Sequence, residues 1–247
     1  MSDVYGAALW SLDFMFTVAV NGGQGVNFHG GGKSPYSPLN DNGTSVTLVG
    51  PEFYGLEMFS LLPPGNAVPA TITPTPTINF TAYGVRQTNG EVSALLDNKE
   101  VNDTVAASIN LGAGVTGAQL IELTGPNLYC TNDYTLGGAP INANGSWTGG
   151  VQTVLLATNG QLTVVVPPMS AYLLNPVISP TNITVSVAGN QMSLGWPGNY
   201  TGWLLQSNST SITSPNWFTV PGSGNTNLMQ FTIQPGQRNV FYRLLLP

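Results

Sequence analysis

The chain has 247 residues, a length that fits one large domain or two modest ones. Only 6% of the residues are charged, and five Lys and Arg leave a formal net charge of -6. This balance excludes a nucleic-acid binder, because neutralising phosphates requires a basic face. A hydrophobic fraction of 42% also excludes a disordered chain. Abundant Gly, Pro, Asn, Thr and Ser are typical of a β protein with many turns, and a neutral ligand such as a sugar fits this chemistry.

The first predicted element is an amphipathic helix over residues 7–20. Its broad apolar face contains Leu9, Trp10, Leu12, Phe14, Met15, Phe16, Val18 and Val20. The segment has no basic region before it and no clear cleavage site, and Asp13 lies inside it, so it is neither a signal peptide nor a membrane span. We predict a globular helix that ends at Asn21-Gly22-Gly23, with no membrane contact.

The next residues complete a unit that is typical of a parallel α/β barrel. Gly25–His29 is predicted to be a short buried strand, and Gly30-Gly31-Gly32 a loop where backbone can approach a ligand. Such a loop lies on the face where these barrels carry their chemistry. A second helix is predicted from Pro51 to about Leu62, and Pro63-Pro64 ends it. The segment therefore indicates the end of a barrel whose earlier strands are missing.

The middle of the chain predicts an antiparallel β-sandwich. Its expected strands are Thr77–Arg86, Val92–Asn98, Ala118–Thr124, Val151–Ala157, Gln161–Val166 and Ala171–Asn175. A hairpin is predicted around Thr158–Gln161, which contains Asn159-Gly160. We expect no helix longer than about two turns after residue 66.

A short linker, residues 175–180, is expected to lead to a small C-terminal β-module. The module's expected strands are Ile183–Val187, Gln191–Trp196, Gly202–Ser207, Trp217–Val220, Gln230–Ile233 and Phe241–Leu245. The predicted organisation is mainly β. Residues 1–65 are a helix-strand-helix remnant of a (β/α)8 barrel, residues 66–175 a β-sandwich, and residues 181–247 the module.

Charge and cysteine are unevenly distributed. All eleven Asp and Glu lie between Asp3 and Asp133, and no charged residue or histidine occurs from Tyr134 to Gln237. Cys130 is the only cysteine, so it forms no intramolecular disulfide, and we interpret it as a buried, inert thiol. No metal site and no cofactor are predicted.

Several motifs resemble the C-terminal half of glycoside hydrolase family 79, the β-glucuronidase and heparanase-like enzymes. They are Ala8-Leu9-Trp10, Asp13, Gly25-Val26-Asn27-Phe28-His29-Gly30-Gly31, Tyr36-Ser37-Pro38-Leu39, Pro51-Glu52-Phe53-Tyr54-Gly55-Leu56 and Pro167-Pro168-Met169-Ser170-Ala171. The resemblance covers about residues 3–175. It implies a (β/α)8 barrel followed by a β-sandwich, and a retaining mechanism with two glutamates on earlier barrel strands. Neither glutamate can be placed in this chain.

The module resembles C-terminal modules of exported proteins in some environmental bacteria. Its marks are Leu194-Gly195-Trp196-Pro197, Gly202-Trp203-Leu204-Leu205-Gln206, Trp217 and Phe241-Tyr242-Arg243-Leu244. This resemblance names no activity. It favours a secreted bacterial protein whose export signal lies outside the given sequence.

The candidate sugar-binding residues lie after the first predicted helix. His29, the only histidine, can hydrogen-bond a sugar hydroxyl beside Asn27, or can bond the backbone of its own loop. The family resemblance places Tyr36 beside the pocket for the sugar's carboxylate, and the alternative is packing against Pro35 and Pro38. These alternatives remain open from the sequence.

Glu52, Glu57 and Asp13 are the remaining catalytic candidates. A retaining pair must lie roughly 5–5.5 Å apart, whereas positions i and i+5 of a helix project about 140° apart. Glu52 is therefore better interpreted as complementing the helix dipole, and Asp13 as bonding a neighbouring barrel element. Trp196, Trp203 and Trp217, with Tyr200, form either a sugar-stacking platform or the core of the module.

Three hypotheses follow. The leading one is the C-terminal portion of a family 79-like glycosidase, structural or accessory as given, whose ancestral substrate carries a β-linked uronic acid or related sugar. The second is a carbohydrate-binding pair of β-domains, and the third a stand-alone glycosidase with a rearranged active site. Without barrel neighbours, Leu9, Trp10, Phe14 and Phe16 are expected to be exposed and to favour self-association.

Overall fold

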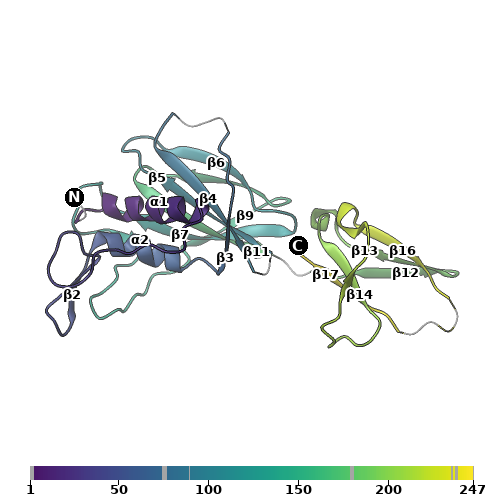
Figure 1. Ribbon diagram of the computed structural model, residues 1–247. Coiled ribbons are helices and arrows are strands. Elements are labelled where there is room, and N and C mark those ends of the chain that lie inside the picture. Colours follow the sequence, from purple (N-terminus) through teal and green to yellow (C-terminus); the bar gives the residue numbers. More distant parts are fainter. Residues whose placement is uncertain are drawn as a thin grey trace.

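The computed structural model of the protein describes residues 3–73, 77–88, 90–178, 181–234, 236 and 239–246. Figure 1 shows two helices side by side along a large sheet, and a small β unit beyond the end of that sheet. The described residues are mainly β, and the strands of every sheet pair antiparallel. This confirms the predicted fold class at the level of a mainly antiparallel β protein.

The two helices begin and end where the sequence predicts. Helix α1 spans Gly6–Val20. After it, the Asn21 side-chain amide donates to the Thr17 carbonyl at 2.8 Å, and Gly22 has a φ of 84°. Helix α2 spans Pro51–Ser60, with the proline at its first position, where no backbone N–H is needed. The Asn21-Gly22 turn therefore ends α1, and Pro51 marks the start of α2.

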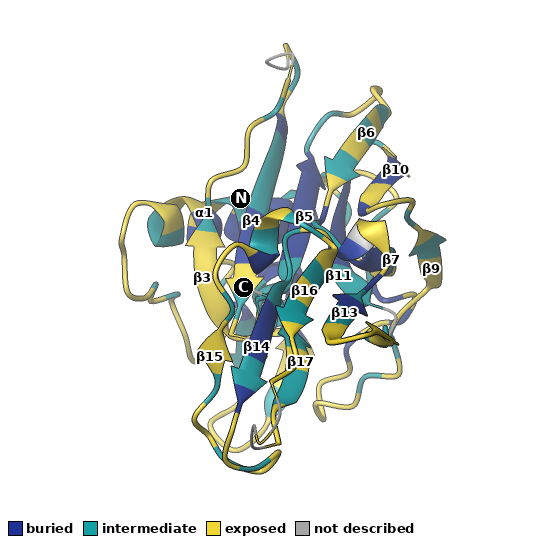
Figure 2. Cartoon of the chain, turned by 90° about the vertical axis from the view of Figure 1, so that its right-hand side faces the viewer, coloured by how far each residue is buried: buried dark blue, intermediate teal, exposed yellow. Residues whose placement is uncertain are grey.

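A seven-stranded sheet forms the centre of the molecule. Its strands are β3 (Gly65–Val68), β4 (Phe80–Gln87), β5 (Val92–Asn98), β11 (Ser170–Ile178), β7 (Val115–Thr124), β8 (Thr135–Leu136) and β9 (Thr153–Leu156). The order is β3-β4-β5-β11-β7-β8, with β9 paired to β7. In Figure 2 the central strands β5 and β11 are mostly dark blue, whereas β3 is yellow.

The two faces of this sheet carry separate hydrophobic clusters. Alternate residues point to opposite faces of a strand. Leu95 and Leu173 therefore pack with the helices, whereas Leu96 and Leu174 pack on the other side. That other side is covered by a two-stranded sheet of β6 (Val105–Asn110) and β10 (Gln161–Val166). The arrangement is three layers deep, with helices, a large sheet and a small sheet.

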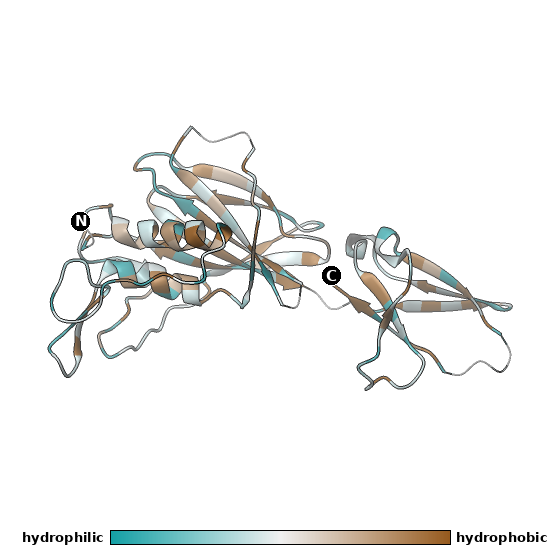
Figure 3. Ribbon diagram, in the orientation of Figure 1, coloured by the Kyte–Doolittle hydropathy of each residue, from teal (hydrophilic) through white to brown (hydrophobic). Residues whose placement is uncertain are grey.

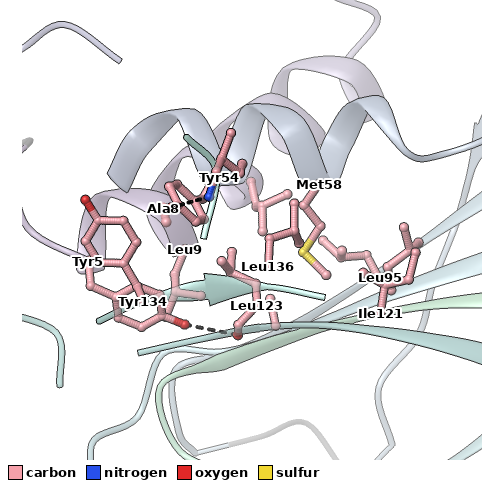
Figure 4. Close-up of a cluster of buried hydrophobic side chains, with 14 of the residues drawn as sticks. Tyr5, Ala8, Leu9, Tyr54, Met58, Leu95, Ile121, Leu123, Tyr134 and Leu136 are labelled. Carbon is pink, nitrogen blue, oxygen red and sulfur yellow. Dashed lines mark hydrogen bonds between the residues drawn. The ribbon is translucent and has the colours of Figure 1, made fainter. Parts of the chain in front are cut away.

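Figure 4 shows how the helical layer joins the sheet. Tyr5, Leu9 and Met58 from the helical segment belong to one cluster with Leu123 and Leu136 from the sheet. The Tyr5 hydroxyl also donates to the Leu123 carbonyl at 3.0 Å. Residues 1–65 and 66–175 thus share one core. The division of the chain at residue 65 stays a prediction.

The C-terminal unit has two small sheets. One contains β12 (Thr184–Ala188), β13 (Gln191–Gly195) and β16 (Leu228–Thr232), and the other β15 (Phe218–Thr219), β14 (Leu204–Asn208) and β17 (Phe241–Leu245). Leu194, Trp196, Tyr200 and Leu205 are buried between them. All six strands match predicted strands within about two residues at either end. In the described residues after 66, the helices are single 3-10 turns, as expected.

Several predictions are wrong in detail. Gly25–His29 forms no strand, because no neighbouring strand pairs with it within the described residues. The turn around Thr158–Gln161 exists, with positive φ at Asn159 and Gly160. Its flanking strands do not form a hairpin, since β9 pairs with β7 and β10 with β6. The expected linker also begins late: β11 continues through Ile178, and residues 179–180 lie outside the described residues.

Two of the four α1 side chains that we expected to be exposed are exposed. Trp10 and Phe14 are 50% and 38% exposed, but Leu9 and Phe16 are buried against α2 and the sheet. The β-sheet thus covers one face of the helix without any barrel neighbour. Figure 3 shows the C-terminal half of α1 in brown, the colour of apolar residues.

Candidate functional site

The loop between α1 and α2 carries the candidate sugar-binding residues. Its first part, residues 23–30, has no regular secondary structure, and the side chains of Asn27 and His29 are exposed. Phe28 is half-buried and meets Phe14 of α1 edge-on, with 6.4 Å between ring centroids. Within the described residues, no backbone hydrogen bond is formed by residues 24–31, so this segment has free donors and acceptors along both sides.

The second part of the loop is held by its own polar groups. Strands β1 (Leu39–Asp41) and β2 (Val46–Val49) form a short hairpin. The Gly32 amide donates to the Asp41 carboxylate at 2.7 Å, and the Ser34 amide donates to Asn40 Oδ1 at 3.1 Å. Tyr36 projects from this loop and is 63% exposed, so packing between its neighbouring prolines does not bury it. A ligand can reach its ring.

A cavity of about 400 Å³ lies where this loop meets the start of α2. The loop contributes Lys33, Ser34 and Asn40, and Pro51 and Tyr134 form other parts of its lining. His29 and Tyr36 do not line it. The structure therefore does not gather the sugar-binding candidates into one pocket.

The glutamates of α2 do not form a catalytic pair. Glu52 is 4% exposed, and its Oε2 has no hydrogen-bond partner within the described residues. Burial raises the pKa of Glu52 above its usual range. Glu57 is half-buried on the same helix, five positions later. A retaining hydrolysis needs one protonated acid and one carboxylate across a common bond, and this helix does not present the two groups in that way.

The Asp13 side chain of α1 takes part in a polar cluster between this helix and the large sheet. Its Oδ1 accepts hydrogen bonds from Thr81 at 2.9 Å and from the Tyr83 hydroxyl, and Lys99 Nζ lies 3.6 Å away. Lys99 also lies 3.3 Å from Asp97, which is fully buried. The expected barrel partner of Asp13 was wrong, because its partners are Thr81 and Tyr83 of β4 and Lys99, which directly follows β5.

The electrostatics of this cluster are set mainly by burial. Desolvation raises the pKa of Asp97 to about 7, although the positive charge of Lys99 opposes the shift. Burial also raises the pKa of Tyr83 to about 12. Asp97 and Lys99 were absent from the sequence-based candidates. Their spacing of two was the available signal, since it puts both side chains on the strand face toward α1.

Of the two alternatives for the tryptophans of the C-terminal unit, the structure favours packing over a sugar-stacking platform. Trp196 is 3% exposed and belongs to the core, which excludes stacking on its face. Trp203 donates its Nε1–H to the Ala113 carbonyl at 3.1 Å and packs edge-on against Tyr200. Trp217 is half-buried, with the Arg243 guanidinium 4.3 Å above its ring. Packing and domain contact account for these three side chains.

The described residues were compared with the requirements of a metal site and of a membrane-spanning helix. No cluster there combines three or more His, Cys, Asp or Glu side chains close enough to hold a metal ion. Cys130 is half-buried and unpaired, rather than buried as predicted. Neither α1 nor α2, the two α-helices of the part that the structure describes, has the length and apolar character of a membrane span.

Solved structures of glycoside hydrolases are similar to part of this chain. A 4-O-α-L-rhamnosyl-β-D-glucuronidase from Fusarium oxysporum 12S is similar over 70% of this chain and 39% of its own, with 20% identity and a TM-score of 0.58. A family 30 subfamily 8 xylanase from Clostridium acetobutylicum shares 14% identity over 71% of this chain and 40% of its own, with a TM-score of 0.47.

The similarity is one of fold and is partial. No protein-family model matches the chain, and no curated protein matches its sequence. The chain spans about two fifths of the length of the two solved structures. The protein therefore has a glycosidase-related fold over the matched part, at an identity that leaves activity open.

Proposed function

We propose that this chain is the C-terminal portion of a family 79-like retaining glycoside hydrolase, and that it completes a catalytic barrel without supplying the catalytic glutamates. The main support for this proposal is the fold that is shared with the rhamnosyl-glucuronidase over 70% of this chain. The free edges of residues 24–31 and the exposed face of α1 fit this role. Both are what a parallel strand and its helix present when their barrel neighbours lie elsewhere.

In this proposal the loop after α1 borders the sugar. His29 and Asn27 hydrogen-bond sugar hydroxyls, and Tyr36 contacts the carboxylate of a uronic acid or the corresponding part of a β-glucoside. Their exposure supports the assignment, because each side chain is reachable from solvent. The proposal needs no cofactor, metal or nucleic acid, and it favours a secreted bacterial protein.

The catalytic test is turnover of chromogenic β-glucuronides. We expect none above a heat-killed control, because Asp13 is held by Thr81 and Lys99, and the α2 glutamates form no pair. Turnover that disappears in folded Glu52→Gln, Glu57→Gln or Asp13→Asn would instead establish a rearranged active site. Sequencing the gene upstream of residue 1 gives a second test, and an in-frame barrel with a glutamate shortly before Ser2 is expected.

The exposed face of α1 gives a third prediction. Trp10 and Phe14 stack with 5.1 Å between ring centroids, and both rings are partly exposed. We expect the chain to self-associate at micromolar concentration through this pair. Light scattering should show a smaller mass for Trp10→Ser/Phe14→Ser. Leu156→Ser is the control, since it removes an exposed side chain from strand β9 and should leave the mass unchanged. A clean wild-type monomer contradicts the prediction.

A further inference from the structure

A cleft of the C-terminal unit lies at one end of the β12-β13-β16 sheet. It has a volume of about 740 Å³. Its floor includes Thr184, Gly195 and Leu228, and its rim includes Thr181, Asn182 and Asn227. The volume is in the range of small-molecule sites, and none of the candidate residues discussed above except Trp196 lines it.

The floor is built from one row of residues across three strands. Thr184 pairs with Gly195, and Gly195 pairs with Leu228. A Cβ on Gly195 would lie 3.1 Å from Thr184 Oγ1 and 3.6 Å from Leu228 Cδ1. The absent side chain therefore leaves a notch between a hydroxyl and a leucine side chain.

The backbone does not require glycine at this position. Gly195 is not among the residues with positive φ, so an L-residue fits its conformation. Glycine weakens a strand, and its presence there often marks a place where a ligand or another chain approaches closely. Glycine here avoids a close contact with Thr184 Oγ1, and it also leaves the Gly195 backbone among the residues that line the cleft.

The lining is polar without being charged. Thr181 and Asn182 make no hydrogen bond within the described residues. Asn227 donates from Nδ2 to the Trp196 carbonyl at 2.8 Å, which leaves its Oδ1 as an acceptor. Thr184 donates to the Gly195 carbonyl at 2.9 Å, so its hydroxyl oxygen can still accept. Leu228, 51% exposed, adds an apolar side.

One further polar group of the lining is unpaired. Trp196 contributes to the cavity wall, and its buried Nε1–H has no hydrogen-bond acceptor within the described residues. Such a donor is costly to leave unpaired, at about 1–3 kcal/mol. Because protein covers this donor, the polar groups that the cleft offers a ligand include those of Thr181, Asn182 and Asn227.

We propose that this cleft binds a neutral sugar unit, with its ring over Gly195 between Thr184 and Leu228. Amides and hydroxyls around an apolar side match a ring that has hydroxyls at its edge and C–H groups on its face. A charged ligand is disfavoured, because among the described residues no cation or anion lines the cleft to offset the loss of its hydration. The proposal does not depend on the barrel proposed above.

The test is calorimetric titration of the full chain with cellohexaose, xylohexaose and laminarihexaose. We expect at least one of these neutral oligosaccharides to bind, and Gly195→Ala to weaken its binding at least tenfold by filling the notch. Asn182→Ala should weaken it several-fold. Because Asn182 is exposed and makes no hydrogen bond within the described residues, this second variant leaves the fold intact.

Gly150→Ala is the matched control, since a Cβ there meets no atom within 4 Å, and it should bind like the wild type. Absence of binding to all three probes overturns the proposal, as does equal affinity in wild type and Gly195→Ala. Tighter binding of a glucuronate-terminated oligosaccharide overturns the neutral-ligand assignment. Turnover of β-glucuronides affects none of these outcomes, so this proposal and the barrel proposal fail separately.

Discussion

Lys99→Met should lower the free energy of unfolding by about 1–2 kcal/mol at pH 8, because Asp97 loses its cation and must take up a proton about one pH unit above its pKa of about 7. Asp97 is fully buried, and Lys99 Nζ, 3.3 Å away, is the cation beside it. One oxygen of Asp97 already lacks a hydrogen-bond partner within the described residues. The remaining titratable neighbours, Asp13, Tyr83 and Tyr5, bring no positive charge that could replace the lysine.

The loss should depend on pH. Burial raises the pKa of Asp97 in the folded protein from its ordinary 3.8 to about 7. Stability from this group is therefore greatest at acidic pH and falls as the pH rises from about 4 through 7. Removing Lys99 takes away the charge that lowers this pKa, so the penalty grows above pH 7. Near pH 5 the carboxyl is largely protonated in the variant, and the loss should be smaller.

Urea denaturation at pH 5 and pH 8 measures the difference. Lys33→Met is the control, because Lys33 is exposed on a loop and its loss should be within about 0.5 kcal/mol. Adding Asp97→Asn to Lys99→Met should restore much of the stability at pH 8, because no buried charge then remains. An equal loss at both pH values would show that Lys99 acts through packing alone.

The sequence predicts elements well where their signals are local. Helix α2 begins at Pro51, and β5, β10 and β17 have the predicted bounds, because prolines, turns and alternating apolar residues mark them. The sequence predicts less well which strands pair with each other. Asn159-Gly160 marks a turn, but strands β9 and β10 find partners in different sheets. The choice of partner depends on which face each strand can bury, and that is a property of the whole core.

In the candidate site, too, features set by local sequence are easier to predict than contacts between distant segments. His29 is exposed although it was predicted to end a buried strand, and the exposure of Tyr36 argues against the alternative in which the neighbouring prolines cover it. Gly25–His29 has the composition of a buried strand, yet it forms none, because a parallel strand exists only through its neighbours. The Asp13 cluster joins α1 to strands that begin more than 60 residues later, and no local pattern predicts that contact.

Gly55→Ala should destabilise the protein by about 2–3 kcal/mol, although the same change in an exposed helix stabilises it by up to about 1 kcal/mol. Gly55 lies where α2 crosses α1. A Cβ there would lie 2.1 Å from Ser11 Oγ and 2.3 Å from the Ala8 carbonyl oxygen. The serine hydroxyl can rotate away, but the carbonyl oxygen of α1 is backbone, so the two helices must separate.

Separation of the helices should also loosen the loop that carries the candidate site. Helices α1 and α2 hold the two ends of the loop that carries His29 and Tyr36. Hydrogen exchange should therefore become faster in α1 and in β1 and β2, together with the lower unfolding free energy. Gly150→Ala, at an open position, is the control and should leave both measurements within about 0.5 kcal/mol of the wild type. A stabilised Gly55→Ala variant would mean that α1 does not pack this closely on α2, and that the sheet alone holds the loop in place.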